Sequence, residues 1–213
     1  MNTLDIIQGT DEWKTIRLGK VTASRVADVV ARTKTGWGAS RAGYAAQLVV
    51  ERLTGSAAES YSNAAMQWGN DHEQEARDAY AFFRDVDVAE IGFVHHPTIP
   101  MSGASPDGLV GNDGLVEIKC PTSATHIETL LGGSVPTKYL TQMQWQMQCT
   151  GRTWCDFVSF DPRLPPEMRL FVRKVERDHA RIAELEDAVA GFLAEVDATV
   201  AELTRLYQQK EAA

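Results

Sequence analysis

Three charged residues of the sequence have the types and the spacing to bind a metal ion and cut a phosphodiester. Asp107 follows Ser105-Pro106, and Glu117 and Lys119 come after the segment Gly111-Asn112-Asp113-Gly114. That segment predicts a hairpin turn, so Asp107 folds back beside the strand that carries the other two residues. Side chains alternate along a strand, so Glu117 and Lys119 share one face. Two carboxylates and an ammonium can therefore converge on one point.

Hard oxygen ligands of this kind suit Mg²⁺ or Mn²⁺. Such an ion lowers the pKa of a water molecule and neutralises charge on a phosphodiester in its transition state. The lysine can orient or activate the attacking water and offset negative charge. The same residues also fit a plain hairpin whose charged side chains face solvent, as charged side chains mostly do.

A further carboxylate lies in the helix expected over residues 63–83. Glu73 shares a face with Tyr80 and Phe83, which the spacing predicts to be buried. A buried carboxylate needs a partner, and a metal ion is one such partner. Arg77, at the rim of the same face, is close enough to matter to Glu73. Glu73 therefore fits either a place near a metal site or an ordinary carboxylate satisfied by its neighbours.

The elements that must position these residues follow from hydrophobic periodicity and turn signals. Helices are expected over residues 10–19, 22–31, 40–53, 124–131 and 136–150, with a loop at 33–39. Strands are expected over residues 88–95, 109–110, 115–119, 154–160 and 168–175. A long amphipathic helix at about 176–208 follows, and its apolar stripe suits packing on the domain or on a neighbouring subunit. This order of elements predicts an α/β domain.

Length and composition indicate an ordinary globular protein. The chain has 213 residues, 44% of them hydrophobic and 23% charged, which suits one domain over residues 1–213. No apolar run approaches the roughly 18–20 residues that span a bilayer, and the first residues do not resemble a signal peptide. Three cysteines fit neither a disulfide framework nor a metal knuckle. We therefore expect no membrane association and a cytoplasmic protein with reduced thiols.

The charge balance limits the kinds of nucleic-acid binding that are expected. Lysine and arginine total 21 against 29 acidic residues, so the net charge is −8. A protein that coats nucleic acid through electrostatics should be basic. The balance therefore argues against non-specific coating of DNA and leaves room for a local basic groove.

Ordered sequence blocks spread over residues 7–175 carry a family resemblance. They are Gln8-Gly9, Trp13, Arg17-Leu18-Gly19, Thr22-Ala23-Ser24, Trp68-Gly69, Glu73, Ala76-Arg77, Ser105-Pro106-Asp107-Gly108-Leu109, Glu117-Ile118-Lys119-Cys120-Pro121, Leu131-Gly132-Gly133, Tyr139, Gln142, Gln144 and Asp161-Pro162-Arg163. On these blocks the chain resembles the lambda-exonuclease family, the YqaJ-like viral recombinases, within the PD-(D/E)xK nuclease superfamily. So many blocks in one order are far more specific than the three-residue core alone.

The resemblance implies a role for each residue of the acidic cluster. Asp107 and Glu117 would bind the metal, and the main-chain carbonyl of Ile118 would complete the set. Lys119 would assist the nucleophilic water. Glu73 matches the family's helix carboxylate near the metal site. These four side chains, Asp107, Glu117, Lys119 and Glu73, form the implied catalytic set.

The resemblance also implies a pocket for a terminal 5′-phosphate. The matching positions are Arg17, Ser24, Ser105 and Gln142. A guanidinium, hydroxyls and an amide all donate hydrogen bonds to phosphate oxygens, so the set is chemically reasonable.

The chain departs from the family pattern after Cys120-Pro121. Where the family carries an arginine, this sequence has Ser123-Ala124-Thr125-His126. His126 and Lys138 are the candidates to replace that arginine. Without a replacement, the phosphate pocket would be weaker than in the family.

The resemblance implies a restriction-endonuclease-like core, with a central mixed sheet flanked by helices. It also implies an exonuclease that uses Mg²⁺, or Mn²⁺, to degrade linear double-stranded DNA 5′→3′ and leave 3′ single-stranded tails for recombination. The expected assembly is a homotrimeric ring around DNA, with a single-strand annealing protein as partner, in the cytoplasm of a bacterial host cell. One alternative is a PD-(D/E)xK endonuclease or a nuclease of other polarity. Another is an inert DNA-binding module, which a broken catalytic set would indicate, whereas the set here is intact.

Overall fold

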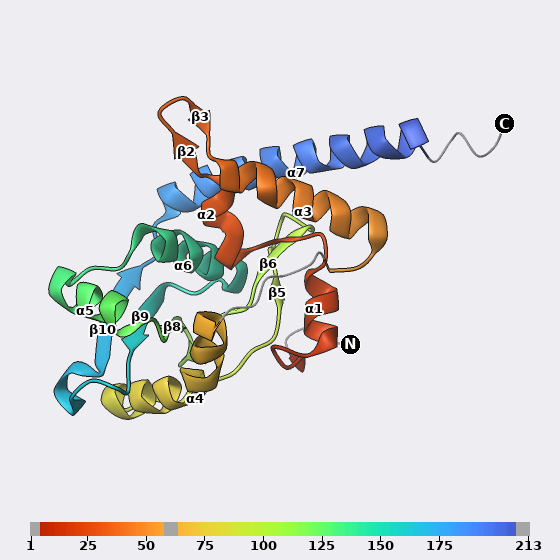
Figure 1. The fold of residues 1–213 in the computed structure, drawn as a ribbon. Helices are drawn as coiled ribbons and strands as arrows, with labels where there is room; N and C mark the ends of the chain where they lie inside the picture. Colours follow the sequence, from red (N-terminus) through yellow and green to blue (C-terminus); the bar gives the residue numbers. More distant parts are fainter. Residues whose placement is uncertain (1–4, 58–63, 208–213) are drawn as a thin grey trace.

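A mixed five-stranded sheet forms the centre of the protein (Figure 1). The computed structural model describes residues 5–57 and 64–207. The strand order is β10-β9-β8-β7-β4, with β8 and β9 parallel and the other neighbours antiparallel. The strands are β4 (Val88–Ala89), β7 (Gly108–Val110), β8 (Gly114–Lys119), β9 (Trp154–Phe160) and β10 (Leu170–Glu176). The expected central mixed sheet and the hairpin of β7 and β8 are confirmed.

Helices cover both faces of this sheet, and strand β8 contacts both layers. Val116 and Ile118 of β8 belong to the apolar cluster that α4 (Ala64–Arg84) forms on one face. Leu115 belongs to the cluster that α6 (Thr137–Thr150) forms on the other face. Because side chains alternate along a strand, Glu117 lies on the α6 side with Leu115.

The strand expected over residues 88–95 is wrong as a single element, since it divides between two sheets. Val88–Ala89 is β4 of the large sheet, whereas β5 (Val94–His95) joins a small sheet of order β1-β6-β5. The other strands of the small sheet are β1 (Val21–Thr22) and β6 (Ser102–Ala104). Between β4 and β5, Phe93 is fully buried against Gly103, where any added side chain would clash. This packing draws the second half of the segment away from the large sheet.

The remaining elements lie close to the expected ones, with local differences. They are α1 (Asp11–Arg17), the 3-10 turn η2 (Ala23–Arg25), α2 (Val26–Val29), α3 (Ala39–Thr54), α5 (Ser123–Gly132), η3 (Pro166–Met168) and α7 (His179–Tyr207). The expected helix 22–31 is thus a 3-10 turn and one short helix. The expected loop 33–39 contains a small hairpin of β2 (Arg32–Thr33) and β3 (Gly36–Trp37). The predicted helix ends at residues 63 and 208 lie outside the described residues.

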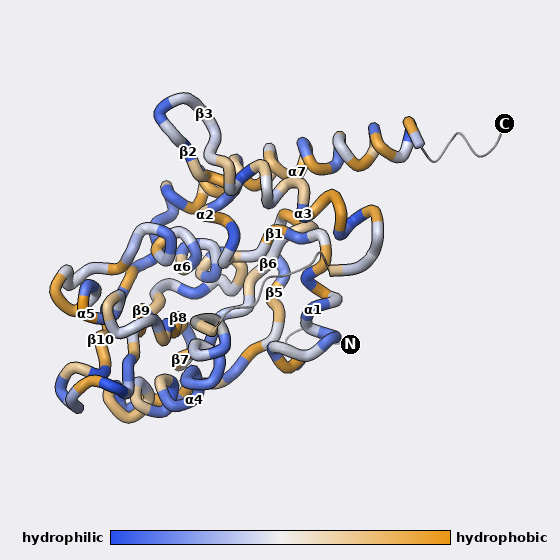
Figure 2. The backbone as a smooth tube through the Cα atoms, in the orientation of Figure 1, coloured by the Kyte–Doolittle hydropathy of each residue, from blue (hydrophilic) through white to orange (hydrophobic). Residues whose placement is uncertain are grey.

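The long helix α7 packs on its own chain, which is one of the two alternatives that its apolar stripe allowed. Its buried residues are Ile182, Leu185, Val189, Phe192, Leu193 and Val196. Figure 2 shows hydrophobic and hydrophilic stretches alternating along α7, as expected of a helix with one apolar face. Arg41 of α3 donates to both carboxylate oxygens of Glu195 at 2.7 and 2.9 Å. No helix within residues 5–57 and 64–207 is long and apolar enough to cross a membrane.

One core prediction on α4 is wrong. Tyr80 is fully buried, but the side chain of Phe83 is 62% exposed and that of Phe82 is 91% exposed. The reason is that the buried face of α4 ends at Tyr80, and one turn later the exposed Arg84 forms an ion pair with Asp156 at the edge of the contact with the sheet. The last turn of α4 therefore leaves its phenylalanines at the surface.

We expect the cluster between α3 and α7 to supply much of the stability. Phe192 is fully buried and stacks on Tyr44 of α3, with ring centroids 5.7 Å apart. Substitution Phe192→Ala should lower the free energy of unfolding by about 3–5 kcal/mol, measured by urea denaturation. The matched control Phe82→Ala removes an exposed ring and should change it by less than about 0.5 kcal/mol. Equal losses in the two variants would contradict the packing described.

Candidate active site

Asp107 and strand β8 are tied together at the open end of the hairpin. The Ile118 amide donates to Oδ2 of Asp107 at 2.6 Å. Gly108 lies directly across from Val116, and a side chain at Gly108 would clash with Val88. The chain can therefore enter β7 close to its neighbours and leave Asp107 beside β8, as the hairpin predicted.

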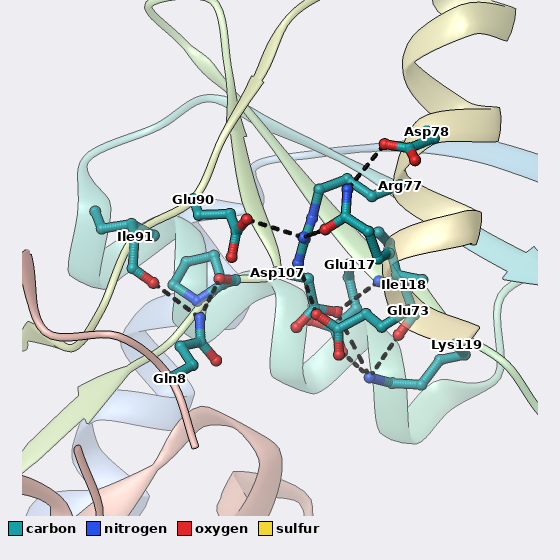
Figure 3. A network of polar contacts seen from close by, with 12 residues as sticks. Gln8, Glu73, Arg77, Asp78, Glu90, Ile91, Asp107, Glu117, Ile118 and Lys119 are labelled. Carbon is teal, nitrogen blue, oxygen red and sulfur yellow. Dashed lines mark hydrogen bonds and ion pairs between the residues drawn. The ribbon is translucent and has the colours of Figure 1, made fainter. Parts of the chain in front are cut away.

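The ammonium of Lys119 lies where three oxygen atoms converge (Figure 3). It is paired with Oε1 of Glu117, donates to the Ile118 carbonyl at 3.0 Å, and lies 3.9 Å from Oδ2 of Asp107. The Glu117 side chain is fully buried, and those of Asp107 and Lys119 are only 14% and 27% exposed. The reading of these residues as solvent-facing hairpin charges is therefore wrong.

Burial and neighbouring charges shift the pKa values of Asp107 and Lys119. Burial, with the nearby charges of Glu117 and Glu73, raises the pKa of Asp107 to about 8, although Lys119 opposes the shift. Burial alone would lower the pKa of Lys119, but the carboxylates of Glu117 and Asp107 raise it above its ordinary value. The lysine is therefore an ammonium at neutral pH, and among the described residues it is the one cation paired with Asp107 and Glu117.

Two glutamines of α6 donate hydrogen bonds to the Glu117 carboxylate. Gln142 donates to Oε1 of Glu117 at 2.6 Å, and Gln146 donates to Oε2 at 2.6 Å. Both glutamines are buried. Gln142 was expected in the phosphate pocket, and the structure places its amide on Glu117 instead. Gln146 was missed, although its spacing of four residues from Gln142 predicts a shared helix face.

Glu73 of α4 faces the same cluster, and its expected neighbour Arg77 is its partner. Arg77 is paired with Glu73 at 2.8 Å and with Glu90 at 3.2 Å (Figure 3). Burial raises the pKa of Glu73, while Arg77 and Lys119 oppose the shift. A pocket of about 420 Å³ runs from Glu73 and Arg77 to Trp13 of α1. The acidic cluster therefore adjoins an open polar pocket.

Two of the four expected phosphate ligands lie together. The Trp13 indole and the Arg17 guanidinium both donate to Oγ of Ser105, at 2.9 and 3.3 Å. Because this oxygen accepts both bonds, the Ser105 hydroxyl proton remains free to donate to an anion. Burial lowers the pKa of Arg17 to about 10, so the guanidinium stays charged at neutral pH. Ser24, in η2, is exposed and makes no side-chain hydrogen bond to another described residue.

Neither candidate replacement for the family arginine forms a hydrogen bond with Arg17 or Ser105 in the described part of the chain. His126 is fully buried, and its ring nitrogens contact the Ser159 hydroxyl at 2.7 Å and the Met168 carbonyl at 2.8 Å. The candidate role of His126 is therefore wrong, because the ring is a core residue. Lys138 is exposed on α6 with its ammonium over the Tyr139 ring.

The oxygens around Lys119 fit a hard divalent cation. Within the described part of the chain, no three side chains of His, Cys, Asp or Glu lie close enough to hold a metal by themselves. A site here would thus need the Ile118 carbonyl beside Asp107 and Glu117. The ammonium of Lys119 already contacts that carbonyl and Glu117, so it stands in for a cation at this point. Two carboxylates and a carbonyl are the donors that Mg²⁺ and Mn²⁺ prefer.

Three solved structures share this fold. The chain is 51% identical to LHK-Exo in complex with dAMP, with a TM-score of 0.89, covering 96% of this chain and 100% of that chain. It is 52% identical to the alkaline exonuclease LHK-Exo from Laribacter hongkongensis, with a TM-score of 0.87 and the same coverage. A phage-related exonuclease from Haemophilus somnus shares the fold at 16% identity, with a TM-score of 0.68 over 86% of this chain and 96% of that chain. No curated protein sequence matches.

The fold and the site define a nuclease with the restriction-endonuclease-like fold. The family of the YqaJ-like viral recombinase domain matches residues 12–153, more than half of the chain. The chain belongs to this family and is a nuclease of the lambda-exonuclease type. The family expected from the sequence blocks is thereby confirmed.

We expect the acidic pair to make the metal-free protein less stable as pH rises. The pKa of Asp107 is about 8 in the fold and near its usual 3.8 when unfolded, so the folded state binds the extra proton between these values. The free energy of unfolding should therefore fall as pH rises through this window. In a chelator, denaturant titrations of Asp107→Asn should show a smaller fall than the wild type.

The control for this experiment is Asp113→Asn in the exposed turn between β7 and β8. It should keep the pH dependence of the wild type. If Asp107→Asn followed the same curve as the wild type, the proposed protonation of Asp107 would be incorrect.

Proposed function

We propose that the protein is a Mg²⁺-dependent exonuclease, also able to use Mn²⁺, that degrades linear double-stranded DNA 5′→3′. It would leave 3′ single-stranded tails for recombination. The observation that carries the proposal is the convergence of Asp107, Glu117 and the Ile118 carbonyl on one cation position. Asp107 comes two residues after Ser105, and the Arg17 guanidinium donates a hydrogen bond to the Ser105 hydroxyl oxygen.

A relative supports DNA as the substrate. LHK-Exo, at 51% identity, was solved in complex with dAMP, a deoxynucleotide. A deoxynucleotide bound by so similar a protein favours DNA over other phosphodiesters.

In the proposed reaction, some residues would bind the metal ion and Lys119 would stabilise negative charge. When bound, the metal ion supplies Lewis-acid stabilisation of the attacked phosphate. Asp107, Glu117 and the Ile118 carbonyl would hold that ion. Lys119 as an ammonium has only N–H donors, so it cannot take a proton from water. It can stabilise the negative charge that builds up on the phosphate oxygens and orient the water by donating to its oxygen.

A pocket for the terminal 5′-phosphate would let the enzyme cut one strand repeatedly from the same end. Water attack on the first phosphodiester breaks the bond between phosphorus and the 3′-oxygen, and that oxygen takes up a proton. The released nucleotide carries the old 5′-phosphate, and the shortened strand begins with a new 5′-phosphate. Each cut thus regenerates the group that Arg17 and Ser105 would bind, with Ser24 and Gln142 as the further ligands that the family resemblance implies.

The proposal extends to assembly and location. We propose one nuclease domain over residues 1–213, three copies in a ring around duplex DNA, a single-strand annealing protein as partner, and a cytoplasmic location in a bacterial host. A ring suits the net charge of −8, because only its inner channel needs to be basic while the acidic exterior repels non-specific contacts. An endonuclease or a nuclease of other polarity would cut covalently closed circular DNA or release nucleotides from 3′ ends, and an inert binding module would do neither.

A single end-labelled assay tests the function. Linear duplex DNA with Mg²⁺ should release mononucleotides from its 5′ ends, while a covalently closed circle of the same sequence should stay intact. Cutting of the circle, or release from 3′ ends first, would reject the proposed activity.

We expect Lys119→Ala to lower the rate of hydrolysis about 100- to 1000-fold, because it removes a positive charge at the attacked phosphate. Single-turnover release of labelled nucleotide measures this rate. The matched control is Lys174→Ala, since its ammonium also lies over an aromatic ring, that of Trp154, but its side chain is 46% exposed. Lys174→Ala should retain nearly the full rate. Full activity in Lys119→Ala would remove the lysine from the chemistry.

We expect Arg17→Ala to abolish a preference for 5′-phosphorylated ends. A charge-assisted hydrogen bond contributes about 1.5–3 kcal/mol, so the rate on phosphorylated ends should fall roughly 10- to 100-fold. The rate on 5′-hydroxyl ends should stay nearly the same. Lys14→Ala on the exposed side of α1 is the control and should leave the ratio of the two rates unchanged. An unaltered ratio in Arg17→Ala would place the phosphate elsewhere.

A further inference from the structure

Glutamines occupy every second position of α6 from residue 142 to residue 148. Some face the central sheet, and the others face α7 or the chain that leads into it. Gln142 and Gln146 donate to Glu117 of the sheet. Gln144 donates to the Glu176 carbonyl at 2.9 Å and accepts from the Asp178 amide at 2.8 Å, at the approach to α7. Gln142 and Gln146 therefore contact the acidic cluster, whereas Gln144 contacts the chain that leads into α7.

Gln146 is a buried amide that leaves one of its own polar atoms unpaired within the described chain. Its side chain is fully buried, and its Oε1 has no hydrogen-bond partner among the described residues. Leaving a buried polar atom unpaired is unfavourable, and an apolar side chain at this position would avoid that cost. Met143 and Met147, its neighbours on α6, are the apolar residues expected in such a core. The one contact that explains an amide at position 146 is its hydrogen bond to Glu117.

The two oxygens of Glu117 are held in different ways. Oε1 faces the Lys119 ammonium and also accepts from Gln142. Oε2 has Gln146 as its one side-chain donor in the described chain. If Gln142 turns to a DNA phosphate, as the family resemblance implies, Gln146 is the donor that still holds the carboxylate. The orientation that points Oε1 toward the cation position thus depends on Gln146.

We propose that Gln146 is a positioning residue, which fixes the Glu117 carboxylate so that Oε1 faces a bound divalent cation. This inference rests on the proposed function, because it assumes that Glu117 is a metal ligand. Removal of Gln146 would leave Oε2 buried without a donor, so the carboxylate would turn away from the cation position to find one. Residues that hold metal ligands in this way typically change metal affinity about 10- to 100-fold.

The test measures metal binding without DNA. Isothermal titration calorimetry with Mn²⁺ alone, on the full chain, should show about 10- to 100-fold weaker binding in Gln146→Leu than in the wild type. The matched control is Gln144→Leu, on the same helix and similarly buried. Its contacts are to the main chain before α7, so it should lower the melting temperature and leave Mn²⁺ affinity within about twofold of the wild type.

Kinetics separate positioning from a general structural effect. At saturating metal, Gln146→Leu should lower kcat and leave KM for linear duplex DNA nearly unchanged, since the residue touches no substrate. If the leucine variant does not fold, Gln146→Asn keeps the amide but withdraws it from Glu117, and the same loss of affinity is expected.

Three results would overturn the inference or its basis. Unchanged Mn²⁺ affinity in a folded Gln146 variant, or an equal loss in Gln144→Leu, would overturn the positioning role alone. If the wild type itself binds no Mn²⁺ and hydrolyses no DNA, the proposed function fails, and the role of Gln146 fails with it.

Discussion

The burial of Glu117 beside Asp107 is the constraint on which the site depends. Two carboxylates withdrawn from water repel one another, and Lys119 supplies only one positive charge between them. Three hydrogen bonds stabilise these carboxylates. The main-chain amide of Ile118 donates to Asp107, and the side-chain amides of Gln142 and Gln146 donate to Glu117. Such an arrangement is costly for folding alone, and it is the arrangement that a divalent cation would stabilise.

Strand pairing in the sheet fixes the positions of Glu117 and Asp107. The parallel pairing of β8 with β9 holds Glu117 in the middle of the sheet, where α6 can cover it. Antiparallel pairing with β7 brings Asp107 to the end of the same strand. Because Ser105 comes two residues before Asp107, the group around Arg17 is held near the acidic cluster by the chain itself. The fold therefore fixes the spacing between the Arg17–Ser105 pair and the acidic cluster.

Local patterns predicted much of the fold and the acidic cluster. The hairpin, strand 154–160 and the face shared by Glu117 and Lys119 depend on turns and alternation within a few residues of chain. The pairing of β1 with β6 joins strands of two and three residues that lie far apart in sequence, and no local pattern shows it. His126 was misjudged because a histidine near a predicted site and a histidine in the core look alike in sequence. Gln146 had a signal, the i, i+4 spacing with Gln142, but only the structure shows that this face meets a carboxylate.

The central claim is that Asp107, Glu117 and the Ile118 carbonyl bind one divalent cation. A crystal structure of the protein grown with Mn²⁺, with anomalous diffraction recorded near the manganese edge, tests this most directly. We predict an anomalous peak among these three oxygens, with the ammonium of Lys119 moved off Glu117. Manganese bound elsewhere, with Lys119 still paired to Glu117, would contradict the account.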